Sequence, residues 1–193
     1  MRAISDERWM DLALAAAARA GHAGDVPIGA VLVHEDEILA VAGNRREQDN
    51  DPTGHAEVLV LREGGRKLGS WRLQDCTLYV TLEPCPMCMG AAVNARVGRL
   101  VFATRDPKAG AAVSCYQLGT DEQLNHRLVI TEGVRGREAS ALLSRFFASL
   151  RVGGRDIAWN PGDGADLGTG TGVLPLDRPP LAALHASADH RQE

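Results

Sequence analysis

Aromatic residues are scarce in this chain of 193 residues, which contains three Phe, three Trp and two Tyr. Stacking of bases on aromatic rings therefore cannot be its main means of holding a nucleic acid. Long apolar runs are absent as well, since the Ala-rich segment 13–20 is flanked or interrupted by charged residues such as Asp11 and Arg19. Neither a signal peptide nor a membrane-spanning helix is predicted, and we expect a cytoplasmic protein without a membrane partner.

Cysteine is also rare, and the four cysteines of the chain are too few for a disulfide-rich scaffold. Two of them, Cys85 and Cys88, form a C-x-x-C pair, which in a reducing compartment indicates metal binding or redox chemistry. The other two, Cys76 and Cys115, stand singly. Because a zinc ribbon needs a second C-x-x-C pair, that class of structural site is not favoured.

An excess of positive charge is missing, because the formal net charge is −4 at pH 7. Residues 1–151 carry 18 Lys and Arg against 19 Asp and Glu, whereas residues 152–193 carry three against six. The second segment is rich in Gly and Pro, so we expect a folded domain over 1–151 and a disordered tail over 152–193. Phosphate binding needs local positive charge, and the domain offers basic clusters at 45–46, 62–72, 96–108 and 145–151.

Segments with helical spacing of apolar residues alternate with short β-rich runs along the domain. We expect strands over 28–33, 38–42, 77–82, 99–104 and 128–132, and helices over 5–21, 55–65, 86–97 and 138–150. The polar segment 43–54 is expected to be a loop. This order predicts an α/β domain in which helices flank a five-stranded mixed sheet. The β-α-β units after His55 are expected to pair their strands in parallel with right-handed crossovers.

Two short motifs carry the chemistry: His55-Ala56-Glu57, and Pro84-Cys85-Pro86-Met87-Cys88. One imidazole and two thiols can hold a zinc ion and leave its fourth position open for water, as catalytic zinc sites do. Cys85 and Cys88 lie at the start of a predicted helix, where the helix dipole favours thiolate and the i, i+3 spacing lets both sulfurs converge. Glu57 follows the imidazole by two residues and is not expected to bind the metal; it is the candidate proton shuttle.

Other classes of protein leave part of this set without a role. A redox protein built on the two cysteines gives His55 and Glu57 no function. A non-catalytic zinc module predicts a substitution at Glu57, which is present here. Glu83, just before the Pro-Cys motif, is expected to be a structural acid in the strand-to-helix turn and not a metal ligand. H-x-E with P-C-x-x-C is the signature of zinc-dependent nucleobase deaminases.

Beyond these two motifs, residues 8–151 resemble the bacterial tRNA-specific adenosine deaminases, the TadA family. The segments that carry the resemblance are Asp25–Val33, Asn44 with Asp51–Glu57, Thr77–Cys85, Arg105–Ala112, Asn125–Arg127 and Leu142–Phe147. Gly54 departs from the alanine expected there, and the segment 114–123 is less typical of the family. The tail after residue 151 lies outside the resemblance.

The resemblance implies a three-layer α/β/α fold of the cytidine-deaminase type, one zinc ion per subunit and a homodimer. It implies hydrolytic deamination of the wobble adenosine of a tRNA anticodon to inosine, with release of ammonia. His55, Cys85 and Cys88 are then the zinc ligands and Glu57 the proton shuttle. The implied contacts to the substrate are Asn44 to the flipped nucleoside, Val26 and Leu82 as walls of its pocket, and Asp106, Lys108, Asn125 and Phe147 to the anticodon loop.

The alternative function is deamination of a free base or nucleotide, such as guanine, cytosine or deoxycytidylate, since enzymes of that kind share the same metal motifs. Deaminases of the riboflavin pathway share them too, but they usually carry a reductase domain for which this chain has no room. The loop that contains Asn44, the segment Arg105–Ala112 and the arginines of the last helix favour tRNA. An anticodon loop is single-stranded, so that its bases can be turned out into a pocket at modest cost.

Overall fold

The computed structural model describes residues 6–151, so the predicted tail at 152–193 lies outside the described residues. The elements follow the order helix, two strands, two helices, strand, helix, two strands, helix. Their bounds are α1 Asp6–His22, β1 Gly29–His34, β2 Glu37–Gly43, α2 Arg46–Asp49, α3 Ala56–Leu68, β3 Cys76–Leu82, α4 Pro86–Asn94, β4 Arg99–Thr104, β5 Val129–Glu132 and α5 Gly136–Arg151.

The five strands form one sheet in the order β2-β1-β3-β4-β5. Strand β1 runs antiparallel to both β2 and β3, and Ala30 is the register partner of Ala42 on one side and of Val80 on the other. Strands β3 and β4 pair in parallel, and so do β4 and β5. The sheet is therefore mixed, and the predicted parallel pairing after His55 is confirmed.

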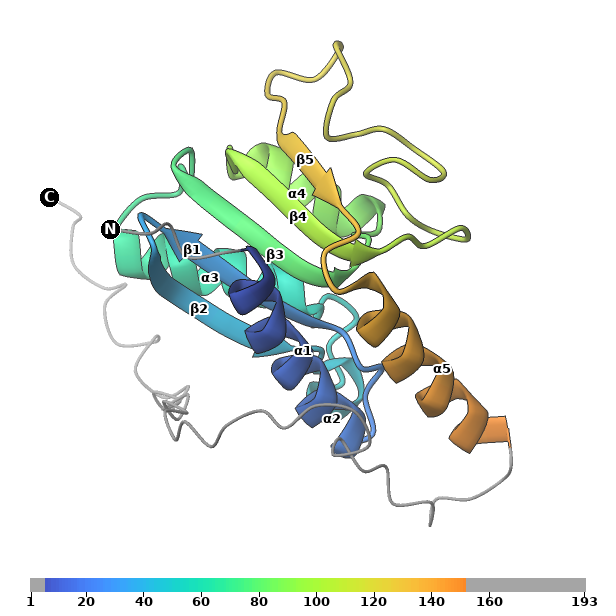
Figure 1. Ribbon diagram of the computed structural model, residues 1–193. Helices are drawn as coiled ribbons and strands as arrows, with labels where there is room; N and C mark the ends of the chain where they lie inside the picture. Colours follow the sequence, from blue (N-terminus) through green and yellow to red (C-terminus); the bar gives the residue numbers. More distant parts are fainter. Residues whose placement is uncertain (1–5, 152–193) are drawn as a thin grey trace, which may run out of the picture.

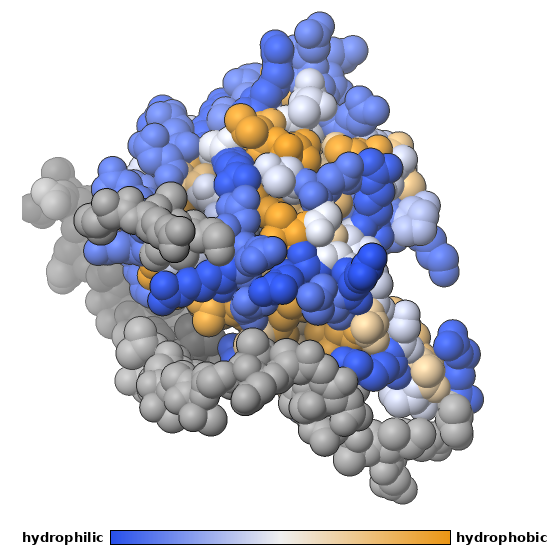
Figure 2. Space-filling view, viewed as in Figure 1, coloured by the Kyte–Doolittle hydropathy of each residue, from blue (hydrophilic) through white to orange (hydrophobic). Residues whose placement is uncertain are grey.

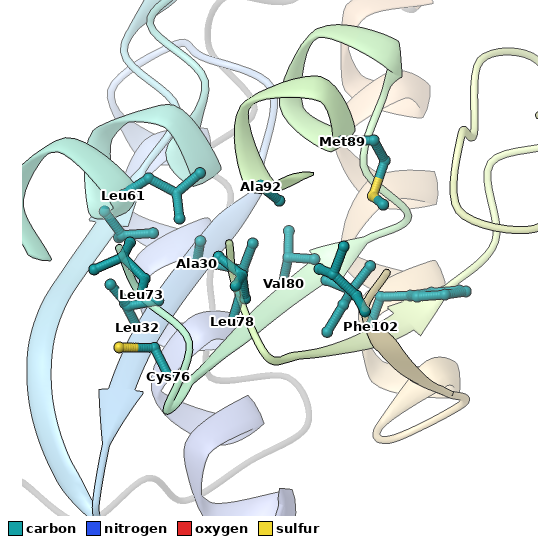
Figure 3. Close-up of a cluster of buried hydrophobic side chains, with 14 of the residues drawn as sticks. Ala30, Leu32, Leu61, Leu73, Cys76, Leu78, Val80, Met89, Ala92 and Phe102 are labelled. Carbon is teal, nitrogen blue, oxygen red and sulfur yellow. The ribbon is translucent and has the colours of Figure 1, made fainter. Parts of the chain in front are cut away.

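Helices cover both faces of the sheet, with α1 and α5 on one face and α3 and α4 on the other (Figure 1). The alternation of side chains along each strand supplies both faces with apolar residues. On the α1 side, Trp9 and Met10 pack against Val31 and Val101. On the other side the sticks of Figure 3 show Leu61, Met89 and Ala92 from the helices meeting side chains of β1, β3 and β4. Burial of these two clusters holds the three layers together.

Three local features differ from the expectation, the first being that α4 ends at Asn94 and not at residue 97. The segment predicted as a loop contains the short helix α2, which ends at Asn50 in the left-handed conformation, with φ 50°. Helix α3 continues past Gly64 and Gly65 to Leu68. A Cβ on Gly64 would stand 2.2 Å from Cδ2 of Leu32, so the glycine lets α3 lie directly on β1 instead of ending the helix there. Tertiary packing here overrides the low helix propensity of glycine.

Close packing of α1 on the sheet also depends on a glycine, Gly29, at the start of β1. A Cβ on Gly29 would stand 2.1 Å from the carbonyl oxygen of Ala13 in α1. The alanines on the buried face of α1 present small side chains to the sheet, so the helix backbone approaches the start of β1.

The surface is mostly polar. Figure 2 shows hydrophilic residues over much of the coloured surface, with apolar residues in patches among them. Exposed apolar side chains include Trp71, Tyr116, Val129, Phe147 and Leu150. Among residues 6–151, no helix combines the length and the apolar character needed to cross a bilayer.

Candidate active site

Two helix N-termini lie next to each other on one face of the sheet. His55 is the N-cap residue of α3 and Cys85 is the N-cap residue of α4, and both have extended backbone conformations. Pro86 occupies the first turn of α4, where its fixed φ and missing N–H are tolerated. The two helices contact each other, so the imidazole and the two thiols converge from different helices.

The donor atoms form a triangle with the dimensions of a zinc site. The Sγ atoms of Cys85 and Cys88 lie 3.7 Å apart, and Nδ1 of His55 lies 3.8 Å from the first sulfur and 3.5 Å from the second. Tetrahedral zinc with ordinary bond lengths separates two sulfurs by about 3.8 Å, and a sulfur from a nitrogen by about 3.6 Å. The residues present therefore fit a zinc ion with three protein ligands.

The three donor groups shift one another's pKa values. The pKa of Cys85 is lowered to about 4 because the Cys88 thiol and His55 hydrogen-bond to its sulfur. The same sulfur–sulfur hydrogen bond, together with burial, raises the pKa of Cys88. The hydrogen bond with Cys85 raises the pKa of His55. A metal ion held by both sulfurs would take the place of the protons of these groups, because the ligands of a metal must be deprotonated.

Glu57 lies on the first turn of α3 beside the triangle. Its side chain is 3% exposed, and Oε2 has no hydrogen-bond partner among the described residues. Burial raises the pKa of this carboxyl. A buried carboxylate oxygen without a partner is costly unless the site uses it. Its environment suits a group that accepts and then donates a proton.

The candidate substrate residues gather mostly at the same end of the sheet as the triangle. Asn44 follows β2, Leu82 ends β3 and Val26 precedes β1; the register between these three strands brings those ends together. Asp106 follows β4, whose Thr104 is the partner of Leu82. This is the end at which ligands of open α/β sheets usually bind.

Asn44 is buried, and its Oδ1 accepts a hydrogen bond of 3.0 Å from the backbone N–H of Ala56. This bond satisfies one of the free N–H groups at the start of α3. It also defines which side-chain atom is oxygen, because a backbone N–H can donate only to an acceptor. The side-chain nitrogen of Asn44 is then the group that can donate to a substrate.

Comparisons with known proteins agree with this site. Residues 4–151 match the model of the MafB19-like deaminase family. The tRNA-specific adenosine deaminase of Bacillus subtilis (strain 168) is 47% identical over 146 residues, which are 76% of this chain and 91% of that protein. A solved structure from work on A-to-I editing by tRNA:A34 deaminases at the wobble position matches with a TM-score of 0.69 and 41% identity, over 70% of this chain and 99% of that one.

The chain belongs to the tRNA-specific adenosine deaminase family. The family resemblance and the fold class inferred from the sequence are thereby confirmed. A guanine deaminase from Nitrosomonas europaea also matches, with a TM-score of 0.65 and 25% identity over 75% of this chain and 85% of that one. The fold is thus shared between deaminases named for different substrates.

Not every contact residue expected from this family lies near the triangle. Asn125 precedes β5, and its Oδ1 accepts a hydrogen bond from the guanidinium of Arg96, which precedes β4. Both therefore lie at the opposite end of the sheet. Phe147, on the last part of α5, is 44% exposed and makes an edge-to-face contact with Phe146 at 5.5 Å between ring centroids. Lys108 is exposed, on the same segment as Asp106.

Asp25 is a buried acid to which the sequence alone assigns no role. Asp25 is 1% exposed, and its carboxylate accepts hydrogen bonds from the backbone N–H groups of Glu47 and Gln48 at 3.4 and 3.3 Å. The Gln48 side-chain amide donates to the same carboxylate at 3.3 Å and to the carbonyl of Asn44 at 3.4 Å. Asp25 thereby ties α2 to the residues just before β1. Nothing local in the sequence distinguishes it from a surface aspartate.

Cavity size does not identify the site. A cavity of about 950 Å³ lies at the start of α5 and is lined by residues such as Arg105, Glu132 and Arg137. It includes neither His55 nor Cys85. The donor chemistry at the two helix N-termini, and not the volume of a cavity, is what locates the candidate active site of this family member.

Proposed function

We propose that this chain deaminates the wobble adenosine of a tRNA anticodon to inosine and ammonia, with zinc held by His55, Cys85 and Cys88. The observation that carries the proposal is the donor triangle with the buried Glu57 beside it, in which Oε2 has no partner among residues 6–151. The name of the 47% identical relative and the wobble-editing neighbour support the choice of tRNA as substrate.

Zinc, when bound, supplies a Lewis acid that makes a water molecule nucleophilic near neutral pH. His55, Cys85 and Cys88 would hold the ion by one imidazole and two thiolates, and a site with three protein ligands would leave room for a fourth ligand. The structure leaves His55 and Cys85 half-buried while Cys88 is fully buried, so the site is accessible from one side. A base turned out of the anticodon loop approaches from that side.

Glu57 moves the protons of the reaction. Its carboxylate accepts a proton from the attacking water and delivers it to ring nitrogen N1 of adenine. The new C–O bond forms at C6, the carbon that carries the amino group. Glu57 then takes the proton of the new hydroxyl group at C6 and transfers it to the amino group, the C–N bond breaks as the C6 oxygen becomes a carbonyl, and ammonia leaves. The base is now hypoxanthine, and the nucleoside is inosine.

Binding groups around the site hold the nucleotide in place. We assign the Asn44 side-chain nitrogen as a donor to the nucleoside, and the half-buried Val26 and Leu82 as apolar walls. Asp106 and Lys108 lie on the segment after β4, where the exposed ammonium can neutralise a phosphate. Phe147 and Asn125 are assigned to the anticodon loop as more distant contacts.

The protein is proposed to act as a cytoplasmic homodimer with one zinc ion per subunit. The chemistry is assigned to residues 1–151, and residues 152–193 are proposed to be a tail that it does not need. A chain that stops after Arg151 is therefore expected to retain its turnover on an anticodon stem-loop. The dimer and its metal content are measurable by light scattering and metal analysis of the purified protein.

The experiment that tests the function compares the wild type and Glu57→Ala on a tRNA with adenosine at the wobble position. Inosine is expected from the wild type alone, with zinc content and folding unchanged in the variant. The variant is expected to be slower by about 10²–10⁴-fold, the range for loss of a general acid–base group. Zinc-loaded wild type that makes no inosine on tRNA, but deaminates free guanine or cytosine, would establish the alternative function.

A further inference from the structure

Glu83 joins the turn that carries Cys85 to the segment that follows β4. Its side chain is 2% exposed. Three successive backbone N–H groups donate to its Oε1 atom, from Ala112 at 3.1 Å, Val113 at 2.7 Å and Ser114 at 2.9 Å. Successive N–H groups that point at one place form a site for an anion, and here the anion is a side chain of the same protein.

The second carboxylate oxygen is used as well. Oε2 of Glu83 accepts hydrogen bonds from the backbone N–H of Asp106 at 3.0 Å and from the hydroxyl of Ser114. Five donors therefore surround the carboxylate, which offsets the cost of burying its charge. The segment 106–114 wraps around a single buried acid, near the base of the long connection between β4 and β5 (Figure 1).

Gly110 makes this arrangement possible. A Cβ on Gly110 would stand 2.3 Å from Oε2 of Glu83 and 2.6 Å from the carbonyl oxygen of Asp106. The backbone supports the same closure, since Gly110 donates to the carbonyl of Asp106 at 2.9 Å and Ala111 donates to the carbonyl of Pro84 at 2.8 Å. The segment thus closes on the residues between β3 and α4.

Glu83 links two parts of the protein that have different chemistry. Glu83 stands two residues before Cys85, whereas the segment that it holds carries Asp106 and Lys108. Asp106 Oδ1 accepts hydrogen bonds from the backbone N–H groups of Lys108 and Ala109 at 2.9 and 3.2 Å, so the position of Asp106 determines where the following residues lie. The buried carboxylate of Glu83 therefore fixes the segment with the candidate RNA-contacting residues relative to the turn that carries Cys85.

We propose that Glu83 is a positioning residue that holds the segment 106–114 in place for RNA binding. The effect of Glu83 on RNA binding rests on the proposed function, because Asp106 and Lys108 contact RNA only if RNA is the substrate. Glu83 itself touches neither substrate nor metal. Its role is to keep the binding segment at a set distance from the donor triangle.

The structural half of the proposal is tested without a substrate. In Glu83→Gln, the side-chain NH₂ faces the N–H of Asp106 or the three donors of residues 112–114, and a donor cannot accept a hydrogen bond. Amide hydrogen exchange of the zinc-loaded protein is expected to quicken at residues 106 and 112–114 relative to the wild type, with exchange in the strands unchanged. Unchanged exchange in this segment would overturn the proposal.

The functional half is tested by steady-state kinetics on an anticodon stem-loop with wobble adenosine. Glu83→Gln is expected to raise KM by about tenfold and to change kcat by less than about threefold, the pattern for loss of binding without loss of transition-state chemistry. A fall in kcat at constant KM, or loss of zinc, would overturn the proposal, because it would show that Glu83 acts on the turn that carries the candidate zinc ligand Cys85. Wild type that makes no inosine refutes the proposed function, while the exchange experiment still tests the role of Glu83.

Two further variants keep the test decisive if Glu83→Gln folds poorly. Ser114→Ala removes one of the five hydrogen bonds, so a smaller rise in KM is expected. Gly110→Ala keeps the carboxylate but places a methyl group against it, so a rise like that of Glu83→Gln is expected. Asp6→Asn is the matched control, because Asp6 is also a hydrogen-bonded acid, paired with Arg99. Asp6→Asn is expected to lower stability and leave KM unchanged. If Asp6→Asn raises KM as much as Glu83→Gln does, the proposal is overturned, because Glu83 then contributes only to folding in general.

Discussion

The Asn44 side chain accepts a hydrogen bond of 3.0 Å from the backbone N–H of Ala56, twelve residues further along the chain. Ala56 begins α3 between the candidate ligand His55 and the candidate proton shuttle Glu57. The residue expected to hold the nucleoside thus also fixes the start of the helix that carries the chemistry. Its oxygen serves the protein, and its nitrogen remains for the substrate.

Replacement of Asn44 separates these two roles. Asn44→Asp keeps an oxygen acceptor for Ala56 and removes the donor, so we expect the melting temperature to stay close to that of the wild type while deamination falls by at least about tenfold. Asn44→Ala loses both groups and is expected to cost about 1 kcal/mol of stability as well. Thermal unfolding and inosine formation measure the two effects. Full activity of Asn44→Asp would show that the Asn44 side-chain nitrogen does not hold the substrate.

Removal of the metal is expected to destabilise the folded domain. A metal that binds the native state alone stabilises it, by about 2.7 kcal/mol when its free concentration is a hundred times the dissociation constant. A chelator should therefore lower the melting temperature of the wild type, and the effect should disappear in Cys88→Ala, whose zinc content should be near zero. Cys115→Ser is the control, since Cys115 is exposed and outside the donor triangle. Equal zinc content in Cys88→Ala and the control would exclude the proposed ligand set.

The pair between Asp6 and Arg99 predicts a pH dependence of stability. Two hydrogen bonds of 2.8 Å from Arg99 lower the pKa of Asp6, and the Tyr79 hydroxyl donates a third. Because the pKa is lower in the folded than in the unfolded chain, the stabilisation is present above about pH 4 and is lost as the pH falls through the folded-state value.

The change that tests this dependence is Asp6→Asn. It is expected to cost about 1 kcal/mol at pH 7, a modest value because both side chains are about one-third exposed. The difference from the wild type should vanish in strong acid, where Asp6 is protonated in both states. Urea unfolding at several pH values measures it. A difference that stays constant down to low pH would exclude the ionised pair as its cause.

Replacement by alanine is expected to change stability in opposite directions at Gly29 and at Gly90. A Cβ on Gly29 would stand 2.1 Å from a backbone oxygen of α1, so Gly29→Ala is expected to cost about 3 kcal/mol or more. A Cβ on Gly90, within α4, meets nothing within 4 Å, so Gly90→Ala is expected to stabilise the helix by about 0.5–1 kcal/mol. Chemical unfolding of both variants is the measurement, and equal effects would contradict the packing of α1 on β1.

Much of the fold follows from local patterns. All five strands appear where the alternation and the apolar runs predict them, because each strand is bounded by turn residues. The short helix α2 was not predicted, because its stability depends on Asp25, a residue more than twenty positions earlier in the chain. The extension of α3 through Gly64 was not predicted either, because it depends on contact with Leu32.

Local sequence motifs are enough to identify the kinds of chemical group at the candidate site. An i, i+3 cysteine pair after proline, and a histidine two residues before a glutamate, are local features, and their combination in one chain indicates a zinc site without knowledge of the fold. How these groups lie relative to one another depends on the packing of the fold: the 3.5–3.8 Å edges of the donor triangle, the burial of Glu57 and the five hydrogen bonds around Glu83. Distances and burial arise when strands and helices far apart in sequence pack together, and periodicity within one segment carries no information about them.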